Sequence, residues 1–209
     1  MSALLVSTTV VSPIYRMLNA EDTDERDRMT ERWKDNKLQE LNFIGIVGGL
    51  MATVMTATGD WPQVFRTEEN TKPWAVRACW FCGLTLALAS VLTSASQSIR
   101  LHRLSCRTDA NAAIRALLSS TKRGKNGEIL PRPTHIYLWQ MGAVYLMISV
   151  MILIAGIFVL LWTAAQGEDE GQGKLAIAFT AVTCTVGGIF VYEQYTLFTW
   201  DTEPPAGSN

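Results

Sequence analysis

The residues best suited to chemistry in this sequence are two cysteines, Cys79 and Cys82, and two histidines, His102 and His135. A C-x-x-C pair places two thiols close enough for redox exchange or for half of a zinc site. These two cysteines lie in an apolar stretch that lacks the alternating strand and helix pattern of redox folds. The spacing therefore favours a packing role, with redox or metal chemistry as the alternative.

No other pattern of an active site accompanies them. Both histidines lie outside the apolar stretches, so they do not form the helix-borne pairs that a b-type cytochrome needs. The zinc-protease pattern H-E-x-x-H, the hydrolase pattern G-x-S-x-G and the nucleotide-binding pattern G-x-x-x-x-G-K-[ST] are all missing from the sequence. We therefore expect a protein that is not an enzyme and that holds no cofactor and no metal.

A group of polar residues is expected to lie together at one end of the apolar stretches. Polar side chains near lipid need partners, so a network that fixes the helices is expected there, with a lipid, ion or ligand site as the alternative. Glu193 is expected to pair with a basic or amide side chain of this group. The members are Asn42, Gln97, Arg100, Arg132, His135, Gln140 and Glu193.

Four apolar stretches must position these residues, at 41–57, 74–96, 136–165 and 175–200. The stretch 136–165 contains no charged residue, and as a helix it would be about 45 Å long, against about 30 Å of bilayer hydrocarbon. Residues 41–200 are therefore predicted to form a four-span membrane domain. The predicted fold is all-α, an integral membrane four-helix bundle with cytosolic helical extensions.

Two ridges of small residues suggest how the spans pack. Such ridges allow helix backbones to approach closely in a membrane, where lipid supplies no hydrophobic drive. We expect the two ridges to face the bundle interior and to contact each other, with a homo-oligomer contact as the alternative. The first ridge is Gly45, Gly49 and Thr53, and the second is Ala176, Thr180, Cys184 and Gly188.

Residues 1–40 are predicted to form a cytosolic segment with a charged helix. The apolar run 4–11 is short, lacks a basic start and is followed by Pro13, which argues against a cleaved signal peptide. Residues 19–40 carry eight acids and five bases at helical spacing, which is typical of a solvated helix leading into the first span. A partner-binding helix is the alternative, and residues 201–209 are expected to be a disordered tail.

The segment 97–135 is predicted to be a basic cytosolic loop. It carries eight bases against two acids, with a helical continuation at 98–104 and a short helix at 110–118 capped by Asp109 or Thr108. A basic turn follows, and Pro131 and Pro133 are expected to stop any helix before the third span. An acidic hairpin is expected at 166–173. Anionic-lipid contacts are assigned to Arg103, Lys122, Arg123 and Lys125.

Charge also predicts the orientation. The loop 97–135 and residues 1–40 hold eight and six bases, whereas the loops 59–73 and 166–174 hold three between them. The positive-inside rule therefore places both termini in the cytosol. The net charge of −1 gives no reason to expect nucleic-acid binding.

The first half of the chain resembles the multi-pass membrane proteins of unknown role that are abundant in filamentous fungi. The resemblance rests on Trp33-Lys34 before the first span, on a W-x-x-R-x-x-W opening at Trp74, Arg77 and Trp80, and on Ser90 and Ser94 in the second span. It covers residues 33–104. It implies a fungal membrane protein and transfers no activity.

Together these features predict a non-enzymatic accessory or scaffold subunit that acts through its cytosolic surfaces. Its partners would be membrane lipids and a protein that binds the N-terminal helix or the basic loop. A channel, carrier or lipid-binding protein is the second hypothesis, although ionisable residues at the middle of the membrane are not found in these spans. A membrane enzyme is the third.

Overall fold

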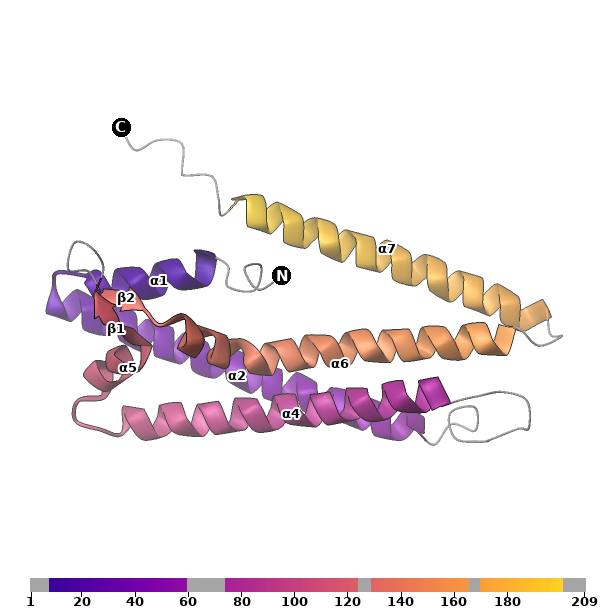
Figure 1. The fold of residues 1–209 in the computed structure, drawn as a ribbon, viewed down its shortest axis with the longest axis horizontal. Coiled ribbons are helices and arrows are strands. Elements are labelled where there is room, and N and C mark those ends of the chain that lie inside the picture. The colour runs from indigo at the N-terminus through magenta and orange to yellow at the C-terminus, as the bar shows by residue number, and fades with distance from the viewer. Residues whose placement is uncertain (1–7, 60–73, 124–128, 166–169, 201–209) are drawn as a thin grey trace. The chain divides into compact units, whose positions relative to one another are not determined.

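The structure, a computed structural model, describes residues 8–59, 74–123, 129–165 and 170–200. Their elements, drawn in Figure 1, are α1 (Thr8–Asn19), α2 (Thr23–Gly59), α4 (Trp74–Ser105), α5 (Ala110–Leu118), β1 (Ser119–Arg123), β2 (Ile129–Pro131), α6 (Pro133–Ala165) and α7 (Glu170–Trp200). The all-α class is confirmed. Four helices, α2, α4, α6 and α7, are long and apolar enough to cross a membrane.

The chain divides into two compact units, which are described separately. The first consists of Met1–Thr56 and Gly83–Val150, and the second of Ala57–Cys82 and Met151–Asn209. Residues 60–73 of the predicted loop, the first half of the acidic hairpin and the tail 201–209 lie outside the described residues, as does Lys125.

The charged N-terminal helix and the first predicted span form one continuous helix, α2, of 37 residues. Neither glycine nor proline interrupts the sequence between Thr23 and Gly45, so nothing in it ends the helix at the start of the apolar stretch. The helix α4 likewise continues past the apolar stretch to Ser105, as expected.

Buried residues on α4 recur at alternating steps of four and three residues. This spacing averages 3.5 residues and is the pattern of helices that pack side by side with a small left-handed crossing. The helix α2 repeats the spacing at Leu41, Ile44 and Gly48. The positions on α4 are Val76, Trp80, Gly83, Ala87, Ser90 and Ser94, followed seven residues later by Leu101.

In the first unit, α4 and α6 are joined by buried serine hydroxyls. Ser90 Oγ donates to the Gly142 carbonyl oxygen, and Ser149 Oγ donates to the Gly83 carbonyl oxygen, each at 2.8 Å. Both serines are completely buried. Each serine thus reaches across to a glycine of the neighbouring helix, where no side chain blocks the carbonyl.

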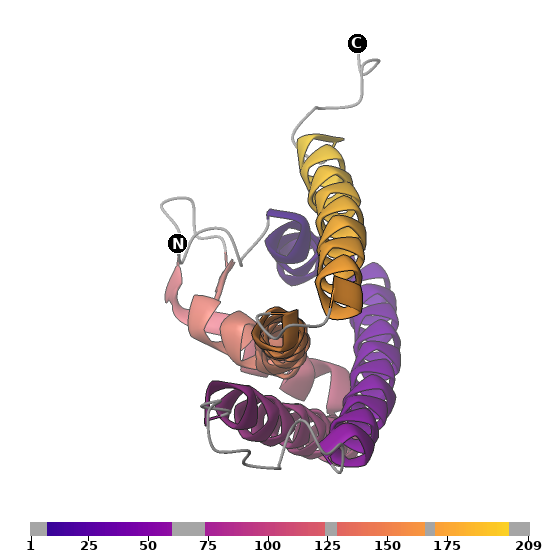
Figure 2. The ribbon, with the colours of Figure 1, turned by 90° about the vertical axis from the view of Figure 1, so that its right-hand side faces the viewer.

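Glycine also sets how closely these helices approach. A Cβ atom added at Gly142 would lie 2.7 Å from Ser94 Oγ on α4, and 3.8 Å from Ile44 on α2. A Cβ atom added at Gly48 would lie 2.9 Å from Val91 Cγ2. In the first unit α2, α4 and α6 therefore contact one another through small residues, and Figure 2 looks along α6 with α2 and α4 beside it.

In the second unit, Trp80 on α4 contacts both α2 and α6. Its Nε1 donates to Thr58 Oγ1 at 3.0 Å, and its ring would lie 2.9 Å from a Cβ atom at Gly156. The helix α7 is attached to α6 near its own start, where Trp162 Nε1 donates to Thr180 Oγ1 at 3.2 Å. Ala176 is buried there.

The helix α1 contains Pro13 in its interior. Proline inside a helix costs about 3 kcal/mol, because it removes a hydrogen bond and crowds the preceding turn. Burial of Ile14, Met17 and Leu18 offsets this cost, since each contributes about 1.5–3 kcal/mol when fully buried. Their spacing of three and four residues places them on one face of the helix.

Three further boundaries differ from the sequence-based expectations. The basic turn is flanked by an antiparallel hairpin in which Ser119 pairs with Pro131, and Arg123 pairs with Ile129. Pro133 is the first residue of α6 rather than only a barrier before it, because the first helical position needs no amide hydrogen. The helix α7 begins at Glu170, so the last part of the predicted acidic hairpin is helical.

Candidate functional site at the charged end of the helices

The most elaborate part of the first unit lies at the charged end of α2, and we call it the cap. It consists of α1, residues 23–40 of α2, α5, the β1–β2 hairpin and the start of α6 (Figure 1). The cap shares one apolar core with the ends of the long helices. The buried members of that core are Ile14, Met17, Leu18, Leu41, Leu101, Ile114, Leu118, Ile136 and Trp139.

Asn19 at the end of α1 joins α1 to the hairpin. Its amide nitrogen donates to the Ile129 carbonyl oxygen at 3.1 Å, and its amide oxygen accepts from the Ile129 backbone nitrogen at 2.9 Å. The same amide nitrogen donates to the Tyr15 carbonyl oxygen at the end of α1. The Asn19 side chain therefore bonds the last turn of α1, and it pairs with Ile129 of β2 as the backbone of a neighbouring strand would.

Arg115 on α5 joins α5 to α2. Its guanidinium forms an ion pair with Asp27 and donates to Thr30 Oγ1 at 3.3 Å. Thr30 is completely buried, and the Arg115 side chain is 17% exposed. A charge removed from water to this extent is retained only with a partner, so this contact holds α5 in one position on α2.

A small cavity of about 130 Å³ lies inside the cap. Trp33 and Trp139 meet edge to face beside it, with ring centroids 6.0 Å apart. Lys37 Nζ lies 2.8 Å from Glu40 Oε1, and the Lys37 side chain is 10% exposed. The lining residues are Ile14, Trp33, Lys37, Glu40, Leu118, Ile136, Trp139 and Gln140.

A larger groove of about 450 Å³ lies between the end of α4 and α5. Two of its lining residues, Arg100 and Arg107, are basic and exposed. Asp109 accepts from Arg107 Nε at 3.1 Å and from Nη2 at 3.3 Å. The other lining residues are apolar, namely Leu104, Ala112, Ala113, Ala116 and Leu117.

Asp109 occupies the position before α5 that the sequence predicted for a cap. Its side chain makes no capping hydrogen bond to the helix. The prediction of a cap at the carboxylate is therefore wrong, and the reason is the competing guanidinium of Arg107 two residues earlier. The apolar edge predicted for α5 is confirmed, because Ile114 and Leu118 are completely buried.

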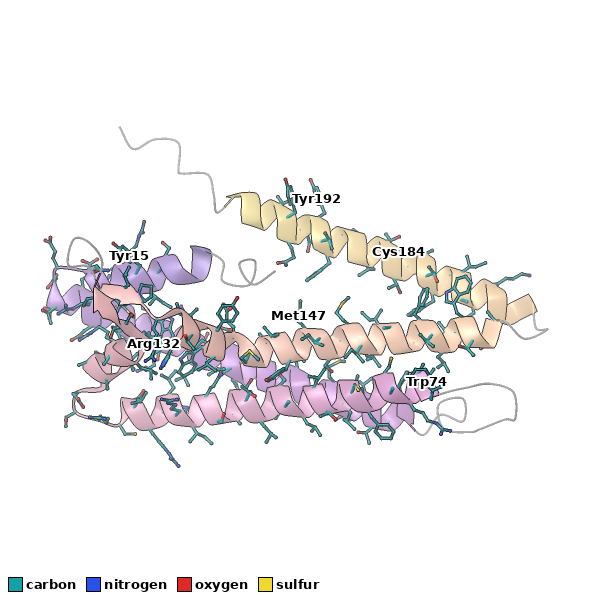
Figure 3. All side chains as sticks on the ribbon, viewed as in Figure 1. Tyr15, Trp74, Arg132, Met147, Cys184 and Tyr192 are labelled. Atoms are coloured by element: carbon teal, nitrogen blue, oxygen red, sulfur yellow. The ribbon has the colours of Figure 1, made fainter. Side chains whose placement is uncertain are left out.

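The predicted polar cluster is distributed over several places. Gln97 Nε2 on α4 donates to the Leu138 carbonyl oxygen on α6 at 2.6 Å, so this member does join two spans. Arg100 lines the groove, whereas Gln140 lines the cavity. Asn42 and Arg132 are exposed and His135 is half-buried, with Arg132 labelled just before α6 in Figure 3.

Three of the residues predicted to contact anionic lipid lie in the part of the chain that the structure describes. Arg103 is exposed on α4. Lys122 and Arg123 belong to β1. Their contact with lipid stays a prediction.

The small ridges are placed as follows. A Cβ atom added at Gly45 or Gly49 meets no atom within 4 Å among the described residues, and Thr53 is exposed. In the first unit the glycine of α2 that packs against another span is instead Gly48. On α7, Ala176 is buried and Thr180 contacts Trp162, whereas Cys184 and Gly188 are exposed.

The ridge pairing and the Glu193 pairing both join residues of different units, so both stay predictions. Glu193 is exposed on α7 and follows Tyr192, which is labelled in Figure 3, in the sequence. Its expected partners belong to the first unit.

The cysteines show no bond to one another, since all four are free thiols. Cys79 is half-buried and its Cβ lies 3.0 Å from a Cβ atom placed at Gly156, whereas Cys82 is exposed. Within the residues that the structure describes, no group of three His, Cys, Asp or Glu side chains is arranged to hold a metal ion.

Three features of the cap were missed by reasoning from the sequence: α1, the hairpin and the buried Lys37. The heptad spacing of α2 could have revealed Lys37, because Thr30, Lys37, Leu41 and Ile44 continue the buried positions of the span back into the charged segment. Asn19 and Arg115 carry no such signal, since their partners lie far away in sequence.

Comparison of the chain with protein-family models, with curated proteins and with solved structures finds no match.

Proposed function

We propose that this chain is a non-enzymatic integral membrane protein that serves as an accessory or scaffold subunit and presents the cap to a partner protein in the cytosol. The observation that carries this proposal is the cap itself. Nine buried apolar residues connect it to the ends of the long helices, so it is a folded platform rather than a set of loops.

The outer face of α2 supplies a surface for a partner. Asp24, Arg28, Glu31, Arg32 and Asp35 are all exposed, and their spacing of three and four residues places them on one face. The opposite face, with Met29 and Trp33, packs against the apolar core. A charged face on a fixed helix favours specific recognition through complementary charge.

The experiment is to extract the protein from its own membrane in a mild detergent and to measure its mass as a complex. The proposal predicts a complex larger than one chain with its detergent. Reversal of two exposed bases, Arg28→Glu with Arg32→Glu, should release the chain from that complex without lowering its melting temperature.

A matched control is Arg16→Glu, because Arg16 is an exposed base on α1 of the same cap. It should leave the complex intact. A chain that runs as a monomer before any substitution would contradict the scaffold proposal. Equal release of the chain from the complex by the α2 substitutions and by Arg16→Glu would also contradict the proposal.

The second candidate function is binding of membrane lipid. The observation that favours it is the groove between α4 and α5, because a groove with exposed arginines and an apolar lining suits an amphiphilic anion. Channel or carrier function has no such specific support among the described residues.

A further inference from the structure

We propose that the groove between α4 and α5 is a binding site for one anionic phospholipid of the adjoining bilayer surface. In this arrangement Arg100 and Arg107 bind the phosphate of the headgroup, while Leu104 and Leu117 line the groove beside the headgroup. The proposal does not depend on the scaffold function, and it rests on the second candidate function, for which it names the site and the ligand.

The position of the groove along α4 places it at the level of lipid headgroups. The apolar part of α4, residues 74–96, is about 34 Å long as a helix, which matches about 30 Å of hydrocarbon with a modest tilt. Arg100 lies one helical turn, about 6 Å, beyond that part. The headgroup layer on each side of the hydrocarbon is about 5–8 Å thick.

The chemistry of the lining matches such a ligand. Arginine presents paired N–H donors that suit phosphate oxygens. Leu104 and Leu117 are half-buried in the groove and form its apolar floor, and three alanines keep it open. A volume of about 450 Å³ is large enough for a phospholipid headgroup, and lies within the usual range of ligand sites.

Asp109 regulates the affinity of the site in this proposal. Its ion pair with Arg107 is exposed, at 59% for the arginine and 54% for the aspartate side chain, so the pair is weak and a phosphate can compete for it. The carboxylate also repels an anionic ligand. Because Asp109 makes no capping hydrogen bond to α5, its charge can be removed without loss of a cap.

The test titrates a fluorescent short-chain phosphatidylserine into the purified full-length protein in neutral detergent. We expect Arg100→Gln and Arg107→Gln each to weaken binding about fivefold, which corresponds to about 1 kcal/mol for each base. Asp109→Asn should strengthen binding. Ala116→Trp, which fills the groove from an exposed position, should abolish it.

The matched control is Arg16→Gln, because Arg16 is an exposed base on α1 of the same cap but does not line the groove. It should weaken binding far less than Arg100→Gln. Equal effects of the two substitutions, together with no effect of Ala116→Trp, would mean diffuse attraction to the basic surface and would overturn the proposal.

Two further measurements complete the test. The melting temperature of each variant shows whether the fold is intact, and Asp109→Asn gives an increase in affinity that unfolding cannot imitate. Inorganic phosphate is the competitor that separates a lipid from a soluble anion. Displacement of the lipid by inorganic phosphate at similar concentration would assign the site to soluble phosphate and contradict the lipid proposal.

Discussion

At the scale of the residue, the cap depends on a small number of polar side chains that are removed from water and paired. Arg115 with Asp27 and Thr30 fixes α5 on α2, and Asn19 fixes α1 on β2. Hydrophobic burial supplies most of the free energy in such a core, but it is not directional. The polar contacts therefore select one arrangement of the elements among several that would bury similar apolar area.

The Arg115 contact gives a first prediction. Arg115→Gln should lower the free energy of unfolding of the cap by about 1–3 kcal/mol, because Asp27 and Thr30 lose a partner where they are partly or fully buried. Thermal melting of the protein in detergent, followed by circular dichroism, measures the change.

Arg103→Gln serves as the control for Arg115→Gln, since Arg103 is exposed. The double variant Asp27→Asn with Arg115→Gln should cost less than the sum of the single substitutions, because both remove the same interaction. Additive losses would show that the pair has no coupling energy and that the contact is incidental.

Glu193 gives a second prediction at this scale. If it pairs with a basic or amide side chain of the first unit, Glu193→Gln keeps a hydrogen bond and should be tolerated, whereas Glu193→Leu should lower the melting temperature. A carboxylate that faces lipid without a partner behaves in the opposite way, since leucine there removes the cost of a charge near hydrocarbon. A higher melting temperature for Glu193→Leu would therefore contradict the pairing.

At the scale of the element, the long helices pack through small and hydroxyl-bearing residues at heptad positions. Apolar side chains gain little from contact with each other in lipid, so close backbone approach and hydrogen bonds between helices become important. Ser90 and Ser149 provide such bonds in the first unit, and Gly48 and Gly142 provide the close approach.

The contrast between two neighbouring glycines gives the third prediction. Gly48→Leu should destabilise the protein by about 1–3 kcal/mol or prevent folding, because even a Cβ atom there lies 2.9 Å from Val91. Gly49→Leu meets open space within its own unit and should be tolerated. Melting in detergent and yield of folded protein compare the two.

Equal damage from Gly49→Leu and Gly48→Leu would contradict this ranking. It would instead support the sequence-based prediction that Gly45, Gly49 and Thr53 contact the ridge of α7 or a second copy of the chain. Cysteines introduced at Gly49 and Gly188 distinguish these two contacts. Contact with the ridge of α7 gives a crosslink within one chain, whereas contact with a second copy gives a crosslinked dimer.

The sequence predicted the long helices well because a helix of apolar residues satisfies its own backbone and needs little further specification. The end of α4, the position of α5 and the buried side of α5 were also predictable from helical spacing. The contact of Gly48 was not, because a search for glycines four residues apart leads to Gly45 and Gly49 and passes over Gly48. The seven-residue repeat on α2 and α4 is the signal that identifies the face of α2 that packs within the first unit.

The cap was less predictable, and the reason is again physical. The residues that form the two strands of the hairpin show no strong strand pattern in the sequence. The hairpin is also held by Asn19, which lies 110 positions from its partner Ile129 in the sequence. Contacts between residues so far apart in the sequence produce no pattern in the local sequence. The polar residues predicted as one cluster are distributed between the groove, the cavity and the contact of Gln97 with Leu138, because their shared depth in the membrane does not determine which face of each helix they occupy.

At the scale of the whole molecule, four apolar helices make an integral membrane protein the coarse description of the chain. The distribution of basic residues predicts that the cap lies in the cytosol, and this orientation underlies the proposed scaffold function. The native Cys106 offers a direct reporter, since it is exposed in the turn between α4 and α5.

The fourth prediction therefore concerns orientation. In a variant whose other cysteines, Cys79, Cys82 and Cys184, are replaced by alanine, Cys106 should react with a membrane-impermeant maleimide only from the cytosolic side of sealed membrane vesicles.

A second variant, which carries Cys106→Ala and Gly171→Cys on the same background, reports the other side, because Gly171 is exposed at the start of α7 and a side chain there meets open space. One candidate span, α6, lies between the two reporters in the sequence, so they should label from opposite sides. Reaction of Cys106 from the outside would reverse the orientation and remove the cap from the compartment in which the proposed partner is expected. Labelling of both reporters from one side would show instead that the helices do not all cross.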